Sequence, residues 1–319
     1  MKNGFFAWAV ITLTVGVFCS CGGGETNTNE YPEEMQQFVE DISYYARSYC
    51  EKPDFIIIPQ NGAELAFNGT DMDEGVRTSY IEAIDGIGIE ELFYNGSLDV
   101  DYERLEMLDL LRTKEKIIMV ADFVDDNNNL EDARYRSENK DFIAFPRSSD
   151  NYHYRLIPEL ISPNNNNINT LSEAQNYLYL ISTENFDSKE EMISEIEKTN
   201  YDVVLIDLFF EGEELQPGDI ERLKTKANEG KRLVISYISI GSLETFRYYW
   251  KQELGGRRPS WAPKRYEGYD DEYWVKFWNP KWQSIIFGND DSYIKKIIDA
   301  GFDGAYLDNV EAYYFLEND

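Results

Sequence analysis

Polar side chains with carboxylate, amide or hydroxyl groups follow most of the short apolar runs in this sequence. Acidic residues dominate these positions, whereas the single histidine, His153, lies in a polar segment that favours a loop. A Ser-His-Asp triad or a histidine-ligated metal is therefore disfavoured. The positions are Gln60, Asn61, Glu90, Glu91, Asp122, Asp125, Asp207, Tyr237, Ser239, Asp308, Asn309 and Glu311.

Paired carboxylates at strand ends suit the cleavage of glycosidic bonds. That reaction needs one carboxylic acid to protonate the leaving oxygen and one carboxylate to attack the sugar or to activate water. Two other interpretations stay open. Carboxylates at strand ends also hold divalent cations through oxygen ligands, and an Asp after a strand, such as Asp122 or Asp207, commonly caps the following helix or turn.

Aromatic residues are concentrated in the last quarter of the chain. Rings exposed in a cleft would stack on sugar rings and accept a cationic amino sugar, although half or more of them are expected to pack in the core. Segment 255–269, which contains Arg257, Arg258, Pro259 and Pro263, predicts a long loop over the site. The aromatic positions are 246, 248–250, 266, 269, 273–274, 277–278 and 282.

The polar positions need elements that bring them together. Short β-rich apolar runs alternate with amphipathic helical stretches, which is typical of parallel βαβ units. Eight such strands in roughly 280 residues favour a (β/α)₈ TIM barrel, whose strands end at a common catalytic face, and a doubly wound open sheet is the alternative. The runs are 55–59, 84–89, 116–123, 142–145, 177–181, 203–208, 233–240 and 304–307, and the helical stretches include 33–49, 101–113, 189–199, 218–229, 243–254 and 291–300.

Residues 31–319 are predicted to form one domain. The Asn-rich stretch 161–167 indicates a linker, placed within 151–176, between two groups of four strands. Four parallel strands alone would leave exposed sheet edges, so one barrel built from both groups is favoured over two domains. The helix predicted at 33–49 has no strand before it and is expected to cover the strand that ends at Asp308.

The N-terminal residues have the composition of a secretory signal. One positive charge at Lys2 precedes an apolar run over 5–18, which is too short to span a bilayer as a stable helix. Ser20 before Cys21 is typical of a bacterial lipoprotein processing site. We therefore expect a signal peptide at 1–20, lipidation of Cys21, a flexible tether at 21–30 and an exported protein that faces the periplasm or the cell surface. An ordinary cleaved signal peptide is the alternative.

Composition limits the partners and cofactors of the chain. The sequence has 60 acidic and 30 basic residues and a formal net charge of -30. This charge repels nucleic acid and favours neutral or cationic ligands, so no nucleic-acid partner is expected and membrane contact is expected only through the lipid anchor. Only Cys50 remains after cleavage at Cys21, so no internal disulfide and no cysteine metal cluster is expected. No cofactor is expected.

Several segments resemble glycoside hydrolase family 114, which includes endo-α-1,4-polygalactosaminidases and a group with an older label as extracellular relatives of cysteinyl-tRNA synthetase. Segments that resemble the first half of the family lie in 177–319, and segments that resemble its second half lie in 31–150. This reversed order resembles a circular permutation. The segments are 203–207, 236–241 with Glu244, Arg247 and Trp250, 277–282 and 301–310, and then 55–62, 84–94 and 117–124. The sequence contains no nucleotide-binding glycine loop that would support aminoacylation.

The resemblance also implies roles for individual residues. Asp308 corresponds to the family's nucleophilic Asp and Glu90 to its acid/base Glu, with Glu91 as the alternative in register. The implied function is hydrolysis of an amino-sugar-containing polysaccharide of the galactosamine type, and the alternative is a non-catalytic carbohydrate-binding barrel. The positions expected to line the sugar site are Asp207, Tyr237, Glu244, Arg247, Asn61, Asp122 and Glu91.

Overall fold

All eight apolar runs form parallel strands in the computed structural model, which describes residues 30–317. The mixed α/β class predicted from the sequence is therefore confirmed. Cys21, the predicted signal peptide and almost all of the predicted tether lie outside the described residues. The strands are β1 (Ile56–Pro59), β2 (Gly86–Leu98), β3 (Ile117–Val124), β4 (Ile143–Ala144), β6 (Tyr177–Leu180), β7 (Val203–Asp207), β10 (Leu233–Ser239) and β14 (Gly304–Asp308).

The eight strands lie side by side in chain order, and the last one pairs with the first. One sheet has the order β1-β14-β10-β7-β6, and a second has the order β2-β3-β4 with the short β5 (Arg147–Ser148) also paired to β3. A parallel bridge between Gln60 and Gly88 joins the two sheets. Every pair is parallel, so the carboxyl ends of the strands meet at one end of the fold.

One contact in the wall of the predicted barrel is made by a loop rather than by paired strands. Among residues 30–317, neither β4 nor β5 forms a ladder with β6. The carbonyl of Tyr154 instead accepts hydrogen bonds from the amides of Ile181 (3.1 Å) and Ser182 (3.2 Å). The rings of Phe145 and Tyr177 also lie 5.4 Å apart across this seam. The fold therefore has the strand order of a TIM barrel without a complete ring of strand pairs.

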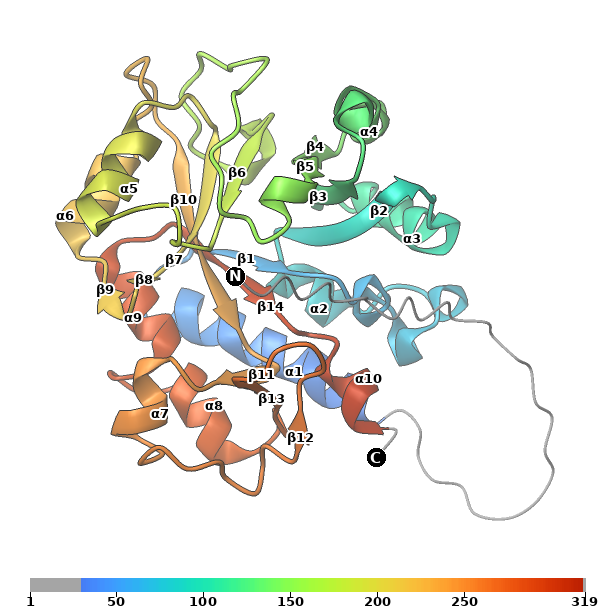
Figure 1. The fold of residues 1–319 in the computed structure, drawn as a ribbon. Helices are drawn as coiled ribbons and strands as arrows, with labels where there is room; N and C mark the ends of the chain where they lie inside the picture. Colours follow the sequence, from blue (N-terminus) through green and yellow to red (C-terminus); the bar gives the residue numbers. More distant parts are fainter. Residues whose placement is uncertain (1–29, 318–319) are drawn as a thin grey trace, which may run out of the picture.

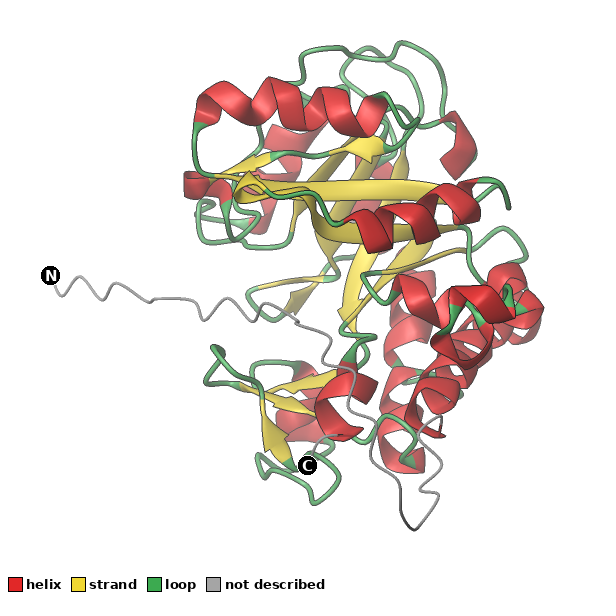
Figure 2. Ribbon diagram, turned by 90° about the vertical axis from the view of Figure 1, so that its right-hand side faces the viewer, coloured by secondary structure: helices red, strands yellow, loops and turns green. Residues whose placement is uncertain are grey.

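Helices pack outside the strands, as Figure 2 shows. Helix α1 contacts α2, and the π-helical turn Tyr45–Tyr49 that continues α1 contacts α9. The helix predicted at 33–49 thus lies between the helices that flank β14 and β1. No helix within residues 30–317 has the length and apolarity to cross a bilayer. The helices are α1 (Glu30–Tyr44), α2 (Thr78–Ala83), α3 (Tyr102–Arg112), α4 (Leu130–Glu138), α5 (Lys189–Glu197), α6 (Pro217–Leu223), α7 (Tyr248–Gln252), α8 (Pro280–Ile286), α9 (Tyr293–Ala300) and α10 (Ala312–Glu317).

The helix predicted over 243–254 is only partly correct. Its first residues belong to strand β11 (Ser242–Glu244), and only α7 is helical. Strand β11 pairs antiparallel with β13 (Glu272–Trp274), which also pairs with β12 (Lys264–Arg265) inside the predicted loop 255–269. This small sheet and helices α7 and α8 form a lobe at one end of the barrel (Figure 1). A hairpin of β8 (Phe209–Phe210) and β9 (Glu213–Glu214) follows β7.

Aromatic side chains fill the interior of the barrel. The ring of Tyr179 packs edge-on against Tyr306 at 5.5 Å, and its hydroxyl donates to Gln60 Oε1 at 2.8 Å. Gly88 makes room for this layer, because a Cβ at this position would lie 1.8 Å from the Tyr306 hydroxyl oxygen. The space between these strands is therefore a packed core rather than a pore.

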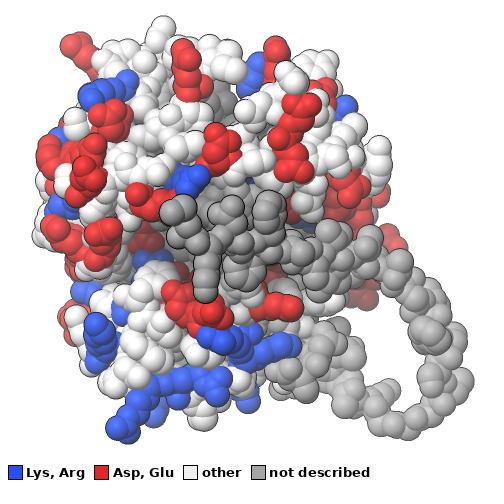
Figure 3. Space-filling model, in the orientation of Figure 1, with Lys and Arg blue, Asp and Glu red and all other residues white. Residues whose placement is uncertain are grey.

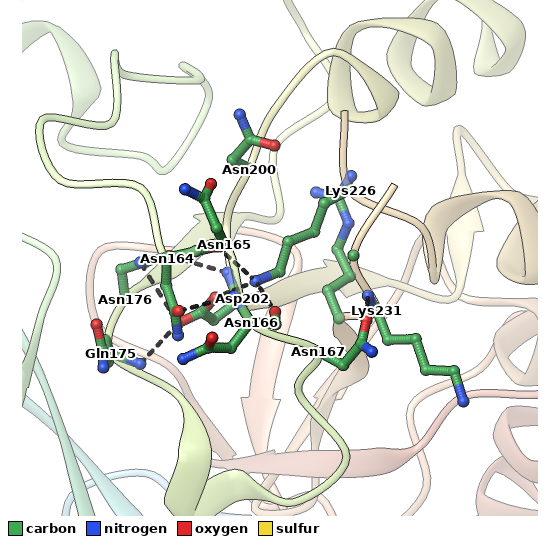
Figure 4. Close-up of polar contacts among 12 residues, drawn as sticks. Asn164, Asn165, Asn166, Asn167, Gln175, Asn176, Asn200, Asp202, Lys226 and Lys231 are labelled. Atoms are coloured by element: carbon green, nitrogen blue, oxygen red, sulfur yellow. Dashed lines mark hydrogen bonds and ion pairs between the residues drawn. The ribbon is translucent and has the colours of Figure 1, made fainter. Parts of the chain in front are cut away.

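The Asn-rich stretch is held in place by a buried ion pair. Lys226 Nζ lies 2.5 Å from Asp202 Oδ1, both side chains are fully buried, and the ammonium also donates to the carbonyls of Asn164 and Asn166 at 2.9 Å (Figure 4). Asp202 Oδ2 in turn accepts a hydrogen bond from the side-chain Nδ2 of Asn164 at 3.0 Å. The predicted linker is thus a loop fixed to the residues that precede β7 and β10.

We predict that replacing Lys226 by Met destabilises the protein by about 3–5 kcal/mol, because Asp202 would stay buried without its cation. Lys198→Met is the control. It removes a pair with Glu195 in which both side chains are about half exposed, and such pairs contribute about 0–1 kcal/mol. Urea unfolding of both variants measures the two losses. Equal losses would contradict a structural role for the buried pair.

Candidate active site

Asp308 is the last residue of β14 and lies deep at the carboxyl end of the barrel. Its Oδ2 accepts a hydrogen bond from the Tyr237 hydroxyl at 2.5 Å, and its Oδ1 accepts from the amide of Asn309 at 2.7 Å. Burial raises the pKa of Asp308 to about 7, although the Tyr237 hydrogen bond opposes the rise, and the charge of Glu90 adds to it. Asp308 is therefore a carboxyl group that gains or loses its proton near neutral pH.

Glu90 lies at the same end of the fold, in the long strand β2. Its amide donates to Asn61 Oδ1 at 3.1 Å, and its carbonyl accepts from Arg104 at 2.9 Å. Its carboxylate is about one quarter exposed and contacts Arg147 at 3.3 Å. The hydroxyl of Tyr154 donates to the same oxygen. Several local interactions thus fix both the backbone and the side chain of Glu90.

Asp308 and Glu90, the two predicted catalytic residues, are brought together by the fold. Strand β1 lies between their strands, paired to β14 on one side and bridged to Gly88 on the other. The charge of Glu90 is close enough to raise the pKa of Asp308. The two carboxyl groups therefore lie at one site on the carboxyl face of the strands.

Asn61 connects this pair to a third carboxyl group. While its Oδ1 accepts from the Glu90 amide, its Nδ2 donates to Glu311 Oε2 at 3.2 Å. Burial raises the pKa of Glu311 to about 7, and the charges of Glu64 and Asp308 act in the same direction. Asn61 thus links the backbone of Glu90 to the side chain of Glu311.

Three other predicted positions form a buried ion cluster. Arg247 Nη1 contacts Asp207 Oδ2 at 2.7 Å, and Arg247 Nε contacts Glu244 Oε2 at 2.7 Å. All three residues are less than one tenth exposed. Burial raises the pKa of Glu244 while Arg247 opposes this rise. The cluster joins the end of β7 to the lobe and leaves these side chains little free surface.

Asp122 lies in the wall of the barrel rather than on an open surface. Its side chain is almost fully buried, and Oδ1 accepts from the amides of Phe93 (2.9 Å) and Tyr94 (3.2 Å). These amides belong to the irregular part of β2 that follows Glu90. Asp122 thus stabilises the backbone of β2 beside Glu90 and does not cap the helix or turn that follows it. Its burial leaves this side chain little surface to offer a sugar.

Glu91 is the alternative to Glu90 as the acid/base residue. Its carboxylate contacts the same guanidinium as that of Glu90. Arg147 lies 3.2 Å from Glu91 Oε1. Burial and the charge of Glu90 raise the pKa of Glu91, while Arg147 lowers it. Unlike Glu90, Glu91 has a left-handed backbone, with φ of 55°. Both neighbouring glutamates therefore belong to the site.

Four non-glycine residues of the site have a left-handed backbone. They are Asn61 (φ 59°), Glu91 (55°), Tyr154 (54°) and Asn309 (62°). Such conformations cost on the order of 1–3 kcal/mol each and persist only where the surrounding structure determines them.

Three further side chains of the site are not among the positions predicted from the sequence. Arg147 and Tyr154 contact Glu90 from the segment that follows β4, and no local pattern marks them. Glu272 lies on β13, where Ser242 donates to its carboxylate at 3.0 Å. Burial raises the pKa of Glu272 to about 8, and the charges of Glu244 and Asp308 add to the rise. Glu272 was not predicted because it follows the predicted loop 255–269 and ends none of the predicted strands.

The predicted aromatic positions differ in their exposure. Tyr249, Trp274 and Trp282 are buried, so the expected packing role applies to them, and several others are partly buried. Phe246 and Tyr269 are exposed, and the charges of Glu90 and Asp308 both act on the Tyr269 hydroxyl. Tyr269 is therefore an exposed ring beside the two carboxylates.

Charge is unevenly distributed on the face drawn in Figure 3. Acidic side chains are spread over the barrel, whereas Lys and Arg gather on the lobe. Among residues 30–317, no group of three or more His, Cys, Asp or Glu side chains has a metal-binding arrangement. On this face, the negative charge thus lies mainly over the barrel-like part and the positive charge over the lobe.

Comparisons with known proteins find one family and several relatives. A model of glycoside-hydrolase family GH114 matches residues 162–319, which include Asp207, Tyr237 and Asp308 but not Glu90. An uncharacterized protein of Methanocaldococcus jannaschii is 33% identical over 171 residues, 50% of this chain and 46% of that protein. An uncharacterized protein of Thermotoga maritima is 30% identical over 121 residues, 38% of this chain and 36% of that protein. The chain thus spans less than half the length of these relatives.

The raised pKa of Asp308 predicts a pH-dependent cost in stability. Between its ordinary pKa of 3.8 and about 7, the folded protein keeps a proton that the unfolded chain has lost, so stability falls as pH rises through this window. Asp308→Asn removes the ionisation. We expect this variant to exceed the wild type in unfolding free energy by about 1–3 kcal/mol at pH 8 and to match it near pH 4.

Denaturant unfolding at both pH values measures this difference. Asp303→Asn is the control, because Asp303 lies just before the same strand and pairs with Lys224 at 2.7 Å. That variant should gain no stability at pH 8. A difference between Asp308→Asn and the wild type that does not change with pH would contradict the assignment.

Proposed function

The chain belongs, through residues 162–319, to glycoside-hydrolase family GH114, and on that premise we propose that it hydrolyses glycosidic bonds of a polysaccharide. The observation that carries the proposal is the meeting of Asp308 and Glu90 at the carboxyl face of the strands, with the charge of one acting on the other. Two carboxyl groups in this arrangement are the machinery that glycoside hydrolysis requires.

We assign the attacking role to Asp308 and the acid/base role to Glu90. Asp308, as a carboxylate, would bond to the anomeric carbon while Glu90 gives its proton to the leaving oxygen. Glu90 would then take a proton from the water that releases the sugar. The Tyr237 hydrogen bond stabilises the ionised form of Asp308. Because Asp308 must be ionised to attack, kcat/KM should rise with pH up to about 7.

For the substrate we propose a polymer with cationic amino sugars of the galactosamine type. The negative charge of Asp308 raises the pKa of both Glu272 and Glu311, so a cation bound among these carboxylates would gain free energy. Tyr269 offers an exposed ring that would stack on a sugar or contact its ammonium group. The endo-α-1,4 cleavage follows from the family resemblance.

We further propose that the protein is exported and anchored by a lipid on Cys21. The support is the sequence of residues 1–21, with its apolar run and Ser20 before Cys21. An anchor followed by a short Gly- and Thr-containing tether would hold the barrel at a membrane surface facing the periplasm or the exterior. A polysaccharide outside the cytoplasm would then be within reach.

We also propose that the chain is a circular permutation of the family's barrel. The pairing of β1 with β14 supports this, because the first and last strands of the chain are neighbours in the wall. The position of the first helix supports it as well, because α1 contacts α2 and the π-helical turn that continues α1 contacts α9. In this interpretation the Asn-rich loop joins the positions that are chain ends in other members.

Hydrolysis of a de-N-acetylated galactosamine polymer tests the function. We expect Asp308→Asn and Glu90→Gln each to lower kcat by about 10²–10⁴-fold, because each removes one group that acts on the breaking bond. Release of reducing ends, followed with time, measures this loss.

One substitution on the same strand is the matched control. Asp303→Asn lies just before β14, at the end opposite to Asp308, so this variant should keep most of the activity. An Asp308→Asn variant that still hydrolyses the polymer would refute the assignment. A wild type that binds the polymer without cleaving it would favour the alternative, a non-catalytic carbohydrate-binding barrel.

A further inference from the structure

Arg147 and Tyr154 hold the Glu90 carboxylate by one of its two oxygens. Nη2 of Arg147 lies 3.3 Å from Glu90 Oε1, and the Tyr154 hydroxyl donates to the same Oε1. Within residues 30–317, both side-chain hydrogen bonds that the Glu90 carboxylate accepts end on Oε1. Oε2 is therefore the oxygen that remains available to a substrate.

The guanidinium of Arg147 is fixed by its surroundings. Its side chain is only 3% exposed and lies over the rings of Tyr152 (4.7 Å) and Tyr154 (4.5 Å). Its Nη1 donates to the Tyr152 carbonyl at 2.6 Å. Burial opposes its charge, but Tyr154, Glu90 and Glu91 together raise the pKa of Arg147 above its ordinary value. Arg147 is thus a permanent, immobile cation beside Glu90.

Tyr154 is equally constrained and joins the seam of the barrel to the site. Its backbone is left-handed, its ring stacks on Tyr179 with centroids 3.8 Å apart, and its carbonyl accepts the two amides that follow β6. A bulky residue rarely adopts this conformation, which marks a position that the surroundings determine. The loop that contains Tyr154 therefore bridges the seam through its backbone and places the Tyr154 hydroxyl at Glu90.

We propose that Arg147 and Tyr154 are positioning residues that orient Oε2 of Glu90 and control its proton, an inference that rests on the proposed hydrolysis. In the first step Oε2–H gives its proton to the leaving oxygen as the glycosidic bond breaks and Asp308 bonds to the anomeric carbon. Glu90 is then a carboxylate, which the Arg147 charge stabilises. In the second step water attacks the anomeric carbon, the bond to Asp308 breaks, and the water proton returns to Glu90.

Carboxyl-carbon NMR of protein labelled in its glutamate side chains tests this control without any substrate. Glu90→Gln identifies the Glu90 signal by its loss. In Arg147→Met and in Tyr154→Phe we expect the Glu90 titration midpoint to move to higher pH, because each variant lacks a group that favours the carboxylate.

Arg232→Met is the matched control, since Arg232 is also buried but donates to the carbonyl of Thr225 at 2.7 Å, away from the site. It should leave the midpoint unchanged. Tyr154→Phe keeps the ring and remains informative if Arg147→Met does not fold. An unmoved midpoint in a folded Tyr154→Phe protein and in any folded Arg147→Met protein overturns the proposal.

Kinetics separate the failure of this inference from the failure of the proposed function. In an active enzyme, both variants should lower kcat by about 10–100-fold with little change in KM and shift the alkaline limb of the pH profile to higher pH. An active wild type whose variants keep its profile contradicts the positioning role alone. A wild type without hydrolytic activity contradicts the proposed function, while the NMR titration still decides whether these residues control the Glu90 proton.

Discussion

Carboxylates that are buried together at the carboxyl ends of parallel strands lose free energy, and the site depends on how this loss is offset. Parallel strands bring their carboxyl ends together, and here those ends carry several acidic side chains. Buried charges are retained when they are paired. Arg247 lies between Asp207 and Glu244, and Arg147 contacts both Glu90 and Glu91. Within residues 30–317 no ion pair reaches Asp308, so this carboxyl group bears the cost in its raised pKa.

The scaffold around the site meets this constraint with interactions from distant parts of the chain. Asn61, Asp122 and Arg104 each bind backbone groups of β2 near Glu90. The left-handed residues of the site are held by such contacts, and the free energy they cost is offset by the packed strands below them. Rigid support of this kind is what keeps two carboxyl groups in a fixed relation during a reaction.

Sequence alone predicts the eight strands well because each is a local apolar run, and the polar residues at their ends follow from the barrel geometry. The small sheet of the lobe was not predicted, since β11 pairs with residues about thirty positions later and its run Leu243–Glu244 also fits a helix. The contacts of Arg147 and Tyr154 with Glu90 were not predicted for the same reason, since these residues lie 57 and 64 positions from Glu90 in the chain. Asp122 was correctly found at a strand end, but only its backbone partners show that it supports β2.

A crystal structure of the Asp308→Asn variant with a galactosamine oligosaccharide is the most direct test of the account. The account predicts a glycosidic oxygen within hydrogen-bonding distance of Glu90 Oε2, with the adjoining anomeric carbon facing residue 308. An oligosaccharide bound away from both residues, in crystals where the site is open to solvent, would contradict the claim that these two carboxyl groups form a hydrolytic pair.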